Sequence, residues 1–170
     1  MAEANSSTHK KIVVRKLDGD EVKGFANTAS FFGSEGVEML DLNGRFVTVP
    51  LGEVKGVYFV RDFEAGAPRR ERKTFLTRPK IGGLWVRLTF IDNDFMEGVI
   101  PNNLKTQQEP GLMIIPPDFS ANNLKIYIPK AALRQLEVLS VVTDGGAKRA
   151  RRKTTYSTRQ LRLFTGREGD

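Results

Sequence analysis

Short runs of alternating apolar and polar residues occur in two stretches of the chain, which is the pattern of half-buried β-strands. In the first stretch the runs span residues 11–17, 21–27, 36–42, 45–49 and 54–60. In the second stretch they span residues 84–90, 95–100, 111–115, 125–129 and 132–139. Regular helical periodicity is scarce, and one turn of helix is expected after Pro129. The pattern therefore predicts an all-β protein with very little helix.

The two groups of five runs follow one another in the same order. Residues 18–24 and 92–98 both read Asp-[Gly/Asn]-Asp-x-x-x-Gly, and each follows the first run of its group. The offset between matching runs grows from 74 to 79 residues, which places the insertions in loops. Five matches in one order indicate an internal duplication.

Turn-forming and bending residues punctuate both copies. Asp-Gly and Asn-Gly pairs favour tight hairpins, and a glycine inside a strand permits a bend. The residues expected in these roles are Asp18, Gly19, Asn43, Gly44, Asp92 and Asn93 in turns, and Gly24 and Gly98 at bends. Because a sheet of about 50 residues buries little and exposes two edges, closure into a small barrel is expected for each copy.

Charge divides the chain further. The net charge is +7, but residues 147–170 hold 8 Lys/Arg and 2 Asp/Glu, and residues 65–83 hold 6 Lys/Arg and one Glu. The remainder is mildly acidic, so two basic arms accompany a nearly neutral scaffold. We therefore expect five regions: a flexible leader 1–10, a first barrel 11–63, a basic linker 64–83, a second barrel 84–143 and a disordered basic tail 144–170.

Composition limits the chemistry. The sequence has no cysteine and one histidine, His9, which lies between polar residues of the leader. The paired aspartates in the turns do not supply the roughly 6–8 oxygen ligands that calcium prefers, so we expect no metal site, no cofactor and no catalysis. The apolar content of 39% and the lack of a long apolar run indicate a soluble protein, and we expect it in the cytoplasm, away from membranes.

The succession of elements resembles the Sm-like fold of LSm and Hfq-type proteins. The residues that carry the likeness are Ile12, Val14, Asp18, Gly19, Val22 and Gly24, and less closely Val86, Leu88, Asp92, Met96 and Gly98. The paired arrangement, with residues 57–63 ending the first copy, also looks like an uncharacterised bacterial family. The resemblance implies two tandem five-stranded barrels. Its RNA pocket does not transfer, because residues 30–33, 49–50 and 128–129 differ from the family's RNA-reading motifs.

The basic arms carry the leading functional prediction, which is contact with nucleic acid, preferably RNA, through phosphate binding. The candidate residues are Arg69, Arg70, Arg72 and Lys73 in the linker, and Lys148, Arg149, Arg151, Arg152 and Lys153 in the tail. The main alternative is a protein–protein scaffold or adaptor that recruits partners by strand addition at exposed sheet edges. Homo-oligomerisation stays open under either interpretation.

A third interpretation starts from a likeness to PilZ-type cyclic-dinucleotide receptors. Those receptors pair an Arg-x-x-x-Arg arm with a downstream Asp-x-Ser-x-x-Gly motif. This chain has Arg-x-x-x-Lys at residues 69–73 and Asp-x-Ser-x-x-Asn at residues 118–123. Both halves depart from the pattern, and the composition of the second half favours ordinary loop residues.

Overall fold

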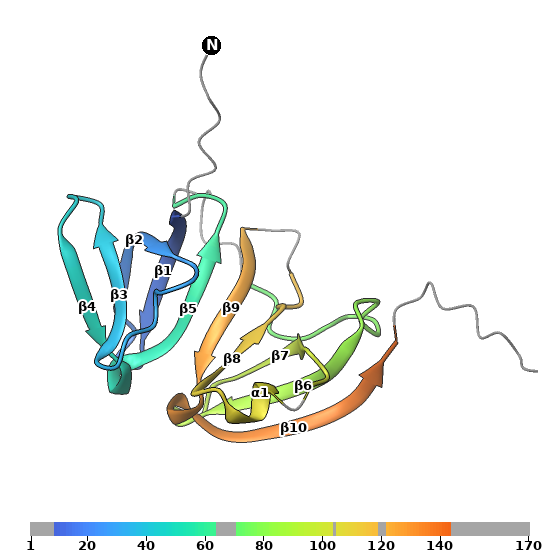
Figure 1. The fold of residues 1–170 in the computed structure, drawn as a ribbon. Coiled ribbons are helices and arrows are strands. Elements are labelled where there is room, and N and C mark those ends of the chain that lie inside the picture. Colours follow the sequence, from blue (N-terminus) through green and yellow to red (C-terminus); the bar gives the residue numbers. More distant parts are fainter. Residues whose placement is uncertain (1–8, 64–70, 104, 119–121, 144–170) are drawn as a thin grey trace, which may run out of the picture.

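The computed structural model describes residues 9–63, 71–103, 105–118 and 122–143. These residues form ten strands, two single-turn 3₁₀ helices and one short α-helix, which confirms the predicted all-β class (Figure 1). The strands are β1 (His9–Lys16), β2 (Glu21–Asn27), β3 (Gly36–Asp41), β4 (Phe46–Pro50), β5 (Val54–Val60), β6 (Gly83–Phe90), β7 (Phe95–Ile100), β8 (Gly111–Ile114), β9 (Asn123–Pro129) and β10 (Leu133–Val142). The helices are η1 (Leu51–Glu53), α1 (Lys105–Gln108) and η2 (Lys130–Ala132). The ten predicted runs thus correspond to the ten strands.

Strands of both copies share one sheet. We call β1–β5 the first unit and β6–β10 the second unit. Seven strands pair in the order β4-β3-β2-β1-β5-β9-β8, and the other three pair in the order β10-β6-β7. The junction between units is the antiparallel pairing of β5 with β9, which lie side by side at the centre of Figure 1. The fifth strand of the first unit is therefore bound to the fourth strand of the second.

Two closed barrels, as expected from the sequence, are not seen among the described residues. In the first unit β5 pairs with β9 of the other unit and not with β4. In the second unit β7 and β8 meet through the single bridge Val99–Ile115, so the five strands divide between two sheets. Pairing across the units satisfies the backbone groups of β5 and β9 that closure within each unit would otherwise have to satisfy.

The first hairpin of each unit has the same turn. The Asp18 carboxylate accepts a hydrogen bond from the amide two residues further on (3.0 Å), and Asp92 does the same (3.0 Å). The residue after each of these aspartates has a positive φ, which is 96° at Gly19 and 67° at Asn93. These left-handed values suit glycine and asparagine better than other residues. The same 3₁₀ turn also follows Pro50 and Pro129, so the duplication extends to local geometry.

The hairpin between β3 and β4 depends on an aspartate that the sequence did not single out. The Asp41 carboxylate accepts hydrogen bonds from the amides of Asn43 (2.8 Å) and Arg45 (2.8 Å). Gly44 takes a φ of 75° at the tip. The hydrogen bond from the Arg45 amide, with the one from Asn43, lowers the pKa of Asp41 despite some desolvation. The predicted Asn43-Gly44 pair thus lies in a turn that a carboxylate organises.

Gly24 is required by a close approach of two strands. It lies opposite Asp41 where β2 meets β3. A Cβ atom built at Gly24 would lie 2.0 Å from the Leu40 carbonyl oxygen. At Gly98 the nearest atom would be a side-chain atom of Ile114 at 3.0 Å, so the two predicted bend glycines are not equally constrained.

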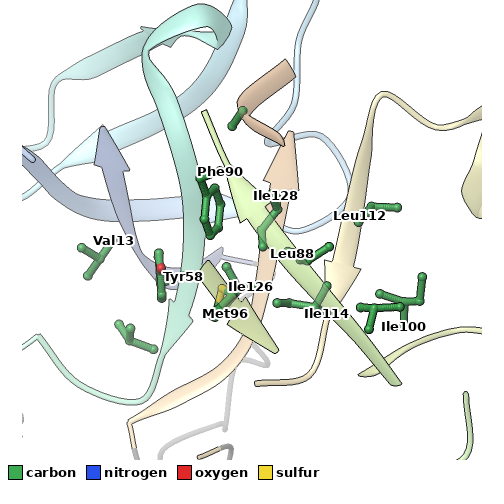
Figure 2. Close-up of a cluster of buried hydrophobic side chains, with 13 residues drawn as sticks. Val13, Tyr58, Leu88, Phe90, Met96, Ile100, Leu112, Ile114, Ile126 and Ile128 are labelled. Atoms are coloured by element: carbon green, nitrogen blue, oxygen red, sulfur yellow. The ribbon is translucent and has the colours of Figure 1, made fainter. Parts of the chain in front are cut away.

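The two hydrophobic cores each contain residues from both units. The first core contains mainly β1–β5 residues such as Val14 and Phe59, together with Tyr127 from β9. The second core contains residues of β6–β9, together with Val13 and Tyr58 from the first unit (Figure 2). Because each unit contributes side chains to the other's core, the two units pack as one body.

Residues 71–82, within the predicted basic linker, lie against the second unit. Glu97 of β7 is 3% exposed and anchors them. Its carboxylate accepts hydrogen bonds from the Phe75 amide (3.1 Å), Trp85 Nε1 (3.1 Å) and Arg87 Nη2 (2.9 Å). The rings of Phe75 and Trp85 also meet edge to face, with centroids 6.0 Å apart. The described part of this segment is therefore attached to β6 and β7.

Candidate functional site

Two of the nine basic residues predicted to contact nucleic acid lie in the described chain. Arg72 is exposed and has no ion-pair partner among the described residues. Lys73 is bound to the Asp94 carboxylate. The others lie outside the described residues: Arg69, Arg70, Lys148, Arg149, Arg151, Arg152 and Lys153. Contact with nucleic acid through these positions stays a prediction from the sequence.

A charged cleft of about 170 Å³ lies between the units, beside residues 71–73. Lys55 of β5 reaches across it, with Nζ 2.5 Å from the Asp92 carboxylate and 3.0 Å from that of Asp94. Desolvation opposes the ionised form of Asp94, but hydrogen bonds from Lys73 and Lys55 outweigh it and lower its pKa to about 2. The first hairpin turn of the second unit is therefore tied to the first unit.

Arg15 makes a second charged link in the same cleft. Its guanidinium binds Glu71 in bidentate fashion, with Nη1 and Nη2 at 2.6 and 2.7 Å from the two carboxylate oxygens. Nε donates to Glu21 at 2.7 Å, and the guanidinium lies 4.1 Å from the ring centroid of Tyr58. Burial disfavours the charge of Arg15, but the hydrogen bonds to Glu71 and Glu21 raise its pKa above the ordinary value. Bidentate, partly buried geometry of this kind fixes the position of the segment that carries Glu71.

The acidic side chains that line the cleft are all paired. Glu71, Asp92 and Asp94 each bind at least one cation that also lines it. A negatively charged ligand would have to displace these pairs, leaving half-buried carboxylates without a partner. The cleft is therefore suited to holding the two units together, and Arg72 is its one described cation without an ion pair.

Two residues of the PilZ-like interpretation, Asn122 and Asn123, lie at another contact between the units. The Asn122 side chain donates to the Asp62 carbonyl (2.9 Å) and accepts from the Asp62 amide (2.9 Å). Asn123 donates to Glu71 at 3.0 Å. Residues 119–121 lie outside the described residues. The described asparagines are thus engaged in protein contacts, and a cyclic-dinucleotide site stays untested.

The outer edge of β10 is the most distinctive open surface. β10 is ten residues long and pairs with β6 on one side, while no described strand pairs with its other side (Figure 1). Its apolar residues Leu136, Val138 and Val141 are 40%, 51% and 52% exposed. At the C-terminal end Arg78 donates to the Val141 carbonyl at 2.8 Å, so the open part is the middle of the strand. A long edge with apolar side chains is a template for another strand.

Two of these residues project from the face of the sheet that packs in the second core. Leu136 and Val138 lie opposite Leu88 and Val86 of β6, which are fully buried in the second core. Because directly opposed residues of an antiparallel pair project from the same face of the sheet, Leu136 and Val138 extend this core to the sheet edge. Their exposure leaves that part of the core uncovered.

The duplication shows how the matching position is covered in the first unit. At an offset of 79 residues, Leu136 and Val138 correspond to Val57 and Phe59 of β5, which are 0% and 2% exposed. In the first unit the neighbouring strand β9 pairs with β5 and adds Tyr127 to the first core. No described strand pairs with β10 in this way. The sequence did not predict this difference in exposure, because β5 and β10 have similar apolar content. Whether their side chains are covered depends on which strand lies at the edge of a sheet.

The search for metal sites and membrane spans and the comparisons with known proteins add no further site to the cleft and the β10 edge. Within the described residues no group of three or more metal-ligating side chains is found, and no helix there is long and apolar enough to cross a membrane. The chain matches, over residues 8–140, the model of a family of unknown function, DUF6982. No curated protein matches the chain, and no solved structure does. The family match spans both units, so the paired arrangement is part of the family's shared sequence.

Proposed function

We propose that this chain, which belongs to the DUF6982 family, is a non-catalytic scaffold that binds an extended protein segment along the edge of β10. The observation that carries this proposal is the exposure of Leu136 (40%) and Val138 (51%) on the core-facing side of an unpaired edge strand. An added strand would cover both side chains and satisfy the outer backbone groups of β10.

The surface beside β10 suits an extended segment. A shallow groove next to the strand is lined by Leu112, Leu133 and Leu136, with Lys130 and Arg134 among the polar residues. In strand addition the main-chain hydrogen bonds supply affinity, and alternate side chains entering such a surface supply specificity. We expect the bound segment to place apolar residues at alternate positions, facing Leu136 and Val138.

The finer fold assignment and the location are part of the same proposal. Each unit has the Sm-like succession of elements, with a first hairpin closed at Asp18 or Asp92 and a 3₁₀ turn before the last strand. This succession supports two Sm-like units that have opened to share strands. The cysteine-free composition supports a cytoplasmic location.

Nucleic-acid contact is the competing function, and Arg72 is the described residue that favours it. The guanidinium of Arg72 is exposed beside the cleft and forms no described ion pair. Single-stranded RNA bound through the basic arms would dissociate steeply as salt rises, because phosphate contacts release counterions. Its binding would not depend on apolar side chains of β10.

Selection from a displayed library of random peptides tests the proposal. Peptides selected on the wild-type chain are measured against Val138→Lys, which places a charge on the β10 edge. Leu76→Lys is the matched control, because Leu76 is 75% exposed and lies outside the strands. We expect alternating apolar peptides whose affinity falls at least tenfold with Val138→Lys and is unchanged with Leu76→Lys.

Two outcomes would overturn the proposal. One is a selection that yields no binding peptide, or peptides that bind both variants equally. The other is salt-sensitive binding of a single-stranded RNA oligonucleotide, retained by Val138→Lys and lost on truncation after Gly146, in a chain that selects no peptide. The second result would establish the nucleic-acid function in its place.

A further inference from the structure

We infer that the strand added to β10 is β4 of a second copy of this chain, so that copies join head to tail. The inference rests on the proposed strand addition at β10 and names its partner. It follows from the junction inside the chain, where the fifth strand of one unit pairs with the fourth strand of the next. Among the described strands of a single chain, the fifth strand without such a partner is β10, and the fourth strand without one is β4.

The internal junction shows what the fourth strand contributes. On β9, Ile126 and Ile128 face the second core of their own unit, whereas Tyr127 enters the first core of the other unit. Lys125, on the same face as Tyr127, pairs with Phe59 and places its Nζ 4.9 Å from that ring. The fourth strand thus presents one face to its own unit and the other to a neighbouring unit.

β4 has the same division between its faces. At the offset of 79 residues, Val47 and Val49 correspond to Ile126 and Ile128, and they pack on the first core of their own unit. The residues that correspond to Lys125 and Tyr127 are Phe46 and Thr48, and both are exposed. Phe46 is 87% exposed, although a phenylalanine gains by burial. The outward face of β4 is therefore open to a neighbouring strand, and no described strand covers it.

The internal register predicts the contacts between copies. On β5 and β9, Val57 pairs with Tyr127 and Phe59 pairs with Lys125. Shifting both strands by the repeat offset sets Thr48 opposite Leu136 and Phe46 opposite Val138. The most exposed aromatic of the described chain then covers the uncovered end of the second core. One contact therefore removes apolar exposure from both edges.

This contact joins two different surfaces of the chain, so it is heterologous. Such contacts generate a closed ring where the rotation per copy closes, and an open filament where it does not. Either assembly uses β4 and β10 once per copy. Blocking one of the two edges therefore leaves a chain that can still pair through the other.

Complementation between edge variants tests the inference. Phe46→Lys blocks β4 and Val138→Lys blocks β10, and both positions are exposed enough for the fold to be retained, which circular dichroism checks. We expect light scattering to give oligomers for the wild type and for Leu76→Lys, and monomers for each edge variant alone. An equimolar mixture of the two edge variants should give dimers of about twice the 19.0 kDa chain mass, since one good β4 edge and one good β10 edge remain.

Cysteine cross-linking checks the register in the otherwise cysteine-free chain. We expect Phe46→Cys mixed with Val138→Cys to form a disulfide-linked dimer under mild oxidation. A mixture of Phe46→Cys with Glu137→Cys should form at least tenfold less disulfide-linked dimer, because adjacent strand residues project to opposite faces. Equal cross-linking in the two mixtures would overturn the register.

The failure of this inference differs from failure of the proposed function. A monomeric wild type at high protein concentration, or a mixture of edge variants that stays monomeric, would overturn head-to-tail assembly. Peptide binding that still requires Val138 would then show that β10 accepts a foreign strand and not β4. Loss of both self-association and peptide binding would overturn the two proposals together.

Discussion

Replacement of the buried Glu97 is expected to detach the segment of residues 71–82 from the second unit. In Glu97→Ala, the Phe75 amide and Trp85 Nε1 lose the carboxylate that each contacts at 3.1 Å. Both donors belong to half-buried residues, so about 1.5 kcal/mol for each is a reasonable cost. The Arg87 side chain is 45% exposed and adds less than about 1 kcal/mol. The expected loss in free energy of unfolding is therefore about 3 kcal/mol.

Urea denaturation followed by fluorescence of Trp85, the single tryptophan, measures this change. Glu137→Ala is the matched control, because Glu137 is exposed on β10 and should change stability by less than about 0.5 kcal/mol. Limited trypsin digestion should show faster cleavage after Lys73 and Lys80 in Glu97→Ala, because both lysines lie in the segment that Glu97 holds. Equal stability of the two variants, with unchanged cleavage, would refute the anchoring role of Glu97.

Two further predictions concern the junction of the units and the first unit. Because Lys73 and Lys55 hold the pKa of Asp94 at about 2, below the unfolded value of 3.8, stability should fall as pH drops from about 4 towards 2. Asp94→Asn should flatten that part of a urea-denaturation pH profile, and an unchanged profile would contradict the pairing. Gly24→Ala should lower the free energy of unfolding by about 3 kcal/mol or prevent folding, since its Cβ would lie 2.0 Å from a carbonyl oxygen. Gly52→Ala, with no atom within 4 Å, should cost less than about 1 kcal/mol in thermal or urea denaturation, and equal losses would contradict the close approach.

Local pattern predicted most of the fold. The alternation of apolar residues located the strands, and the Asp-Gly, Asn-Gly and Pro signals located turns that the structure contains, such as η2 after Pro129. These features depend on neighbours in the sequence. The pairing of β5 with β9 depends on long-range competition between edges, and the sequence has the same alternation whether β5 closes its own unit or joins the other. Barrel closure was predicted because a sheet of about 50 residues exposes two edges, and the alternation does not show that the partner of β5 lies in the other unit.

The candidate site was less accessible from the sequence. The basic clusters can be read directly from the sequence. The ion pair of Lys73 with Asp94 depends on the tertiary structure, which brings the two residues together. Glu97 looks like any polar residue of an alternating strand, and its burial follows from the segment that packs over it. The open edge at Val138 became recognisable when its counterpart Phe59 was found covered. The repeat was therefore the most informative signal, once it could be compared with burial.

The sharing of core residues constrains how the two copies can change over time. Tyr127 packs in the first core, and Val13 and Tyr58 pack in the second. A substitution in one copy is therefore tested by the packing of the other, and neither half contains all the side chains that its own interior needs. Duplicated sequences usually gain freedom to diverge because one copy can vary alone. In this chain the copies can diverge only as a complementary pair, so loss of either half removes part of the other's interior.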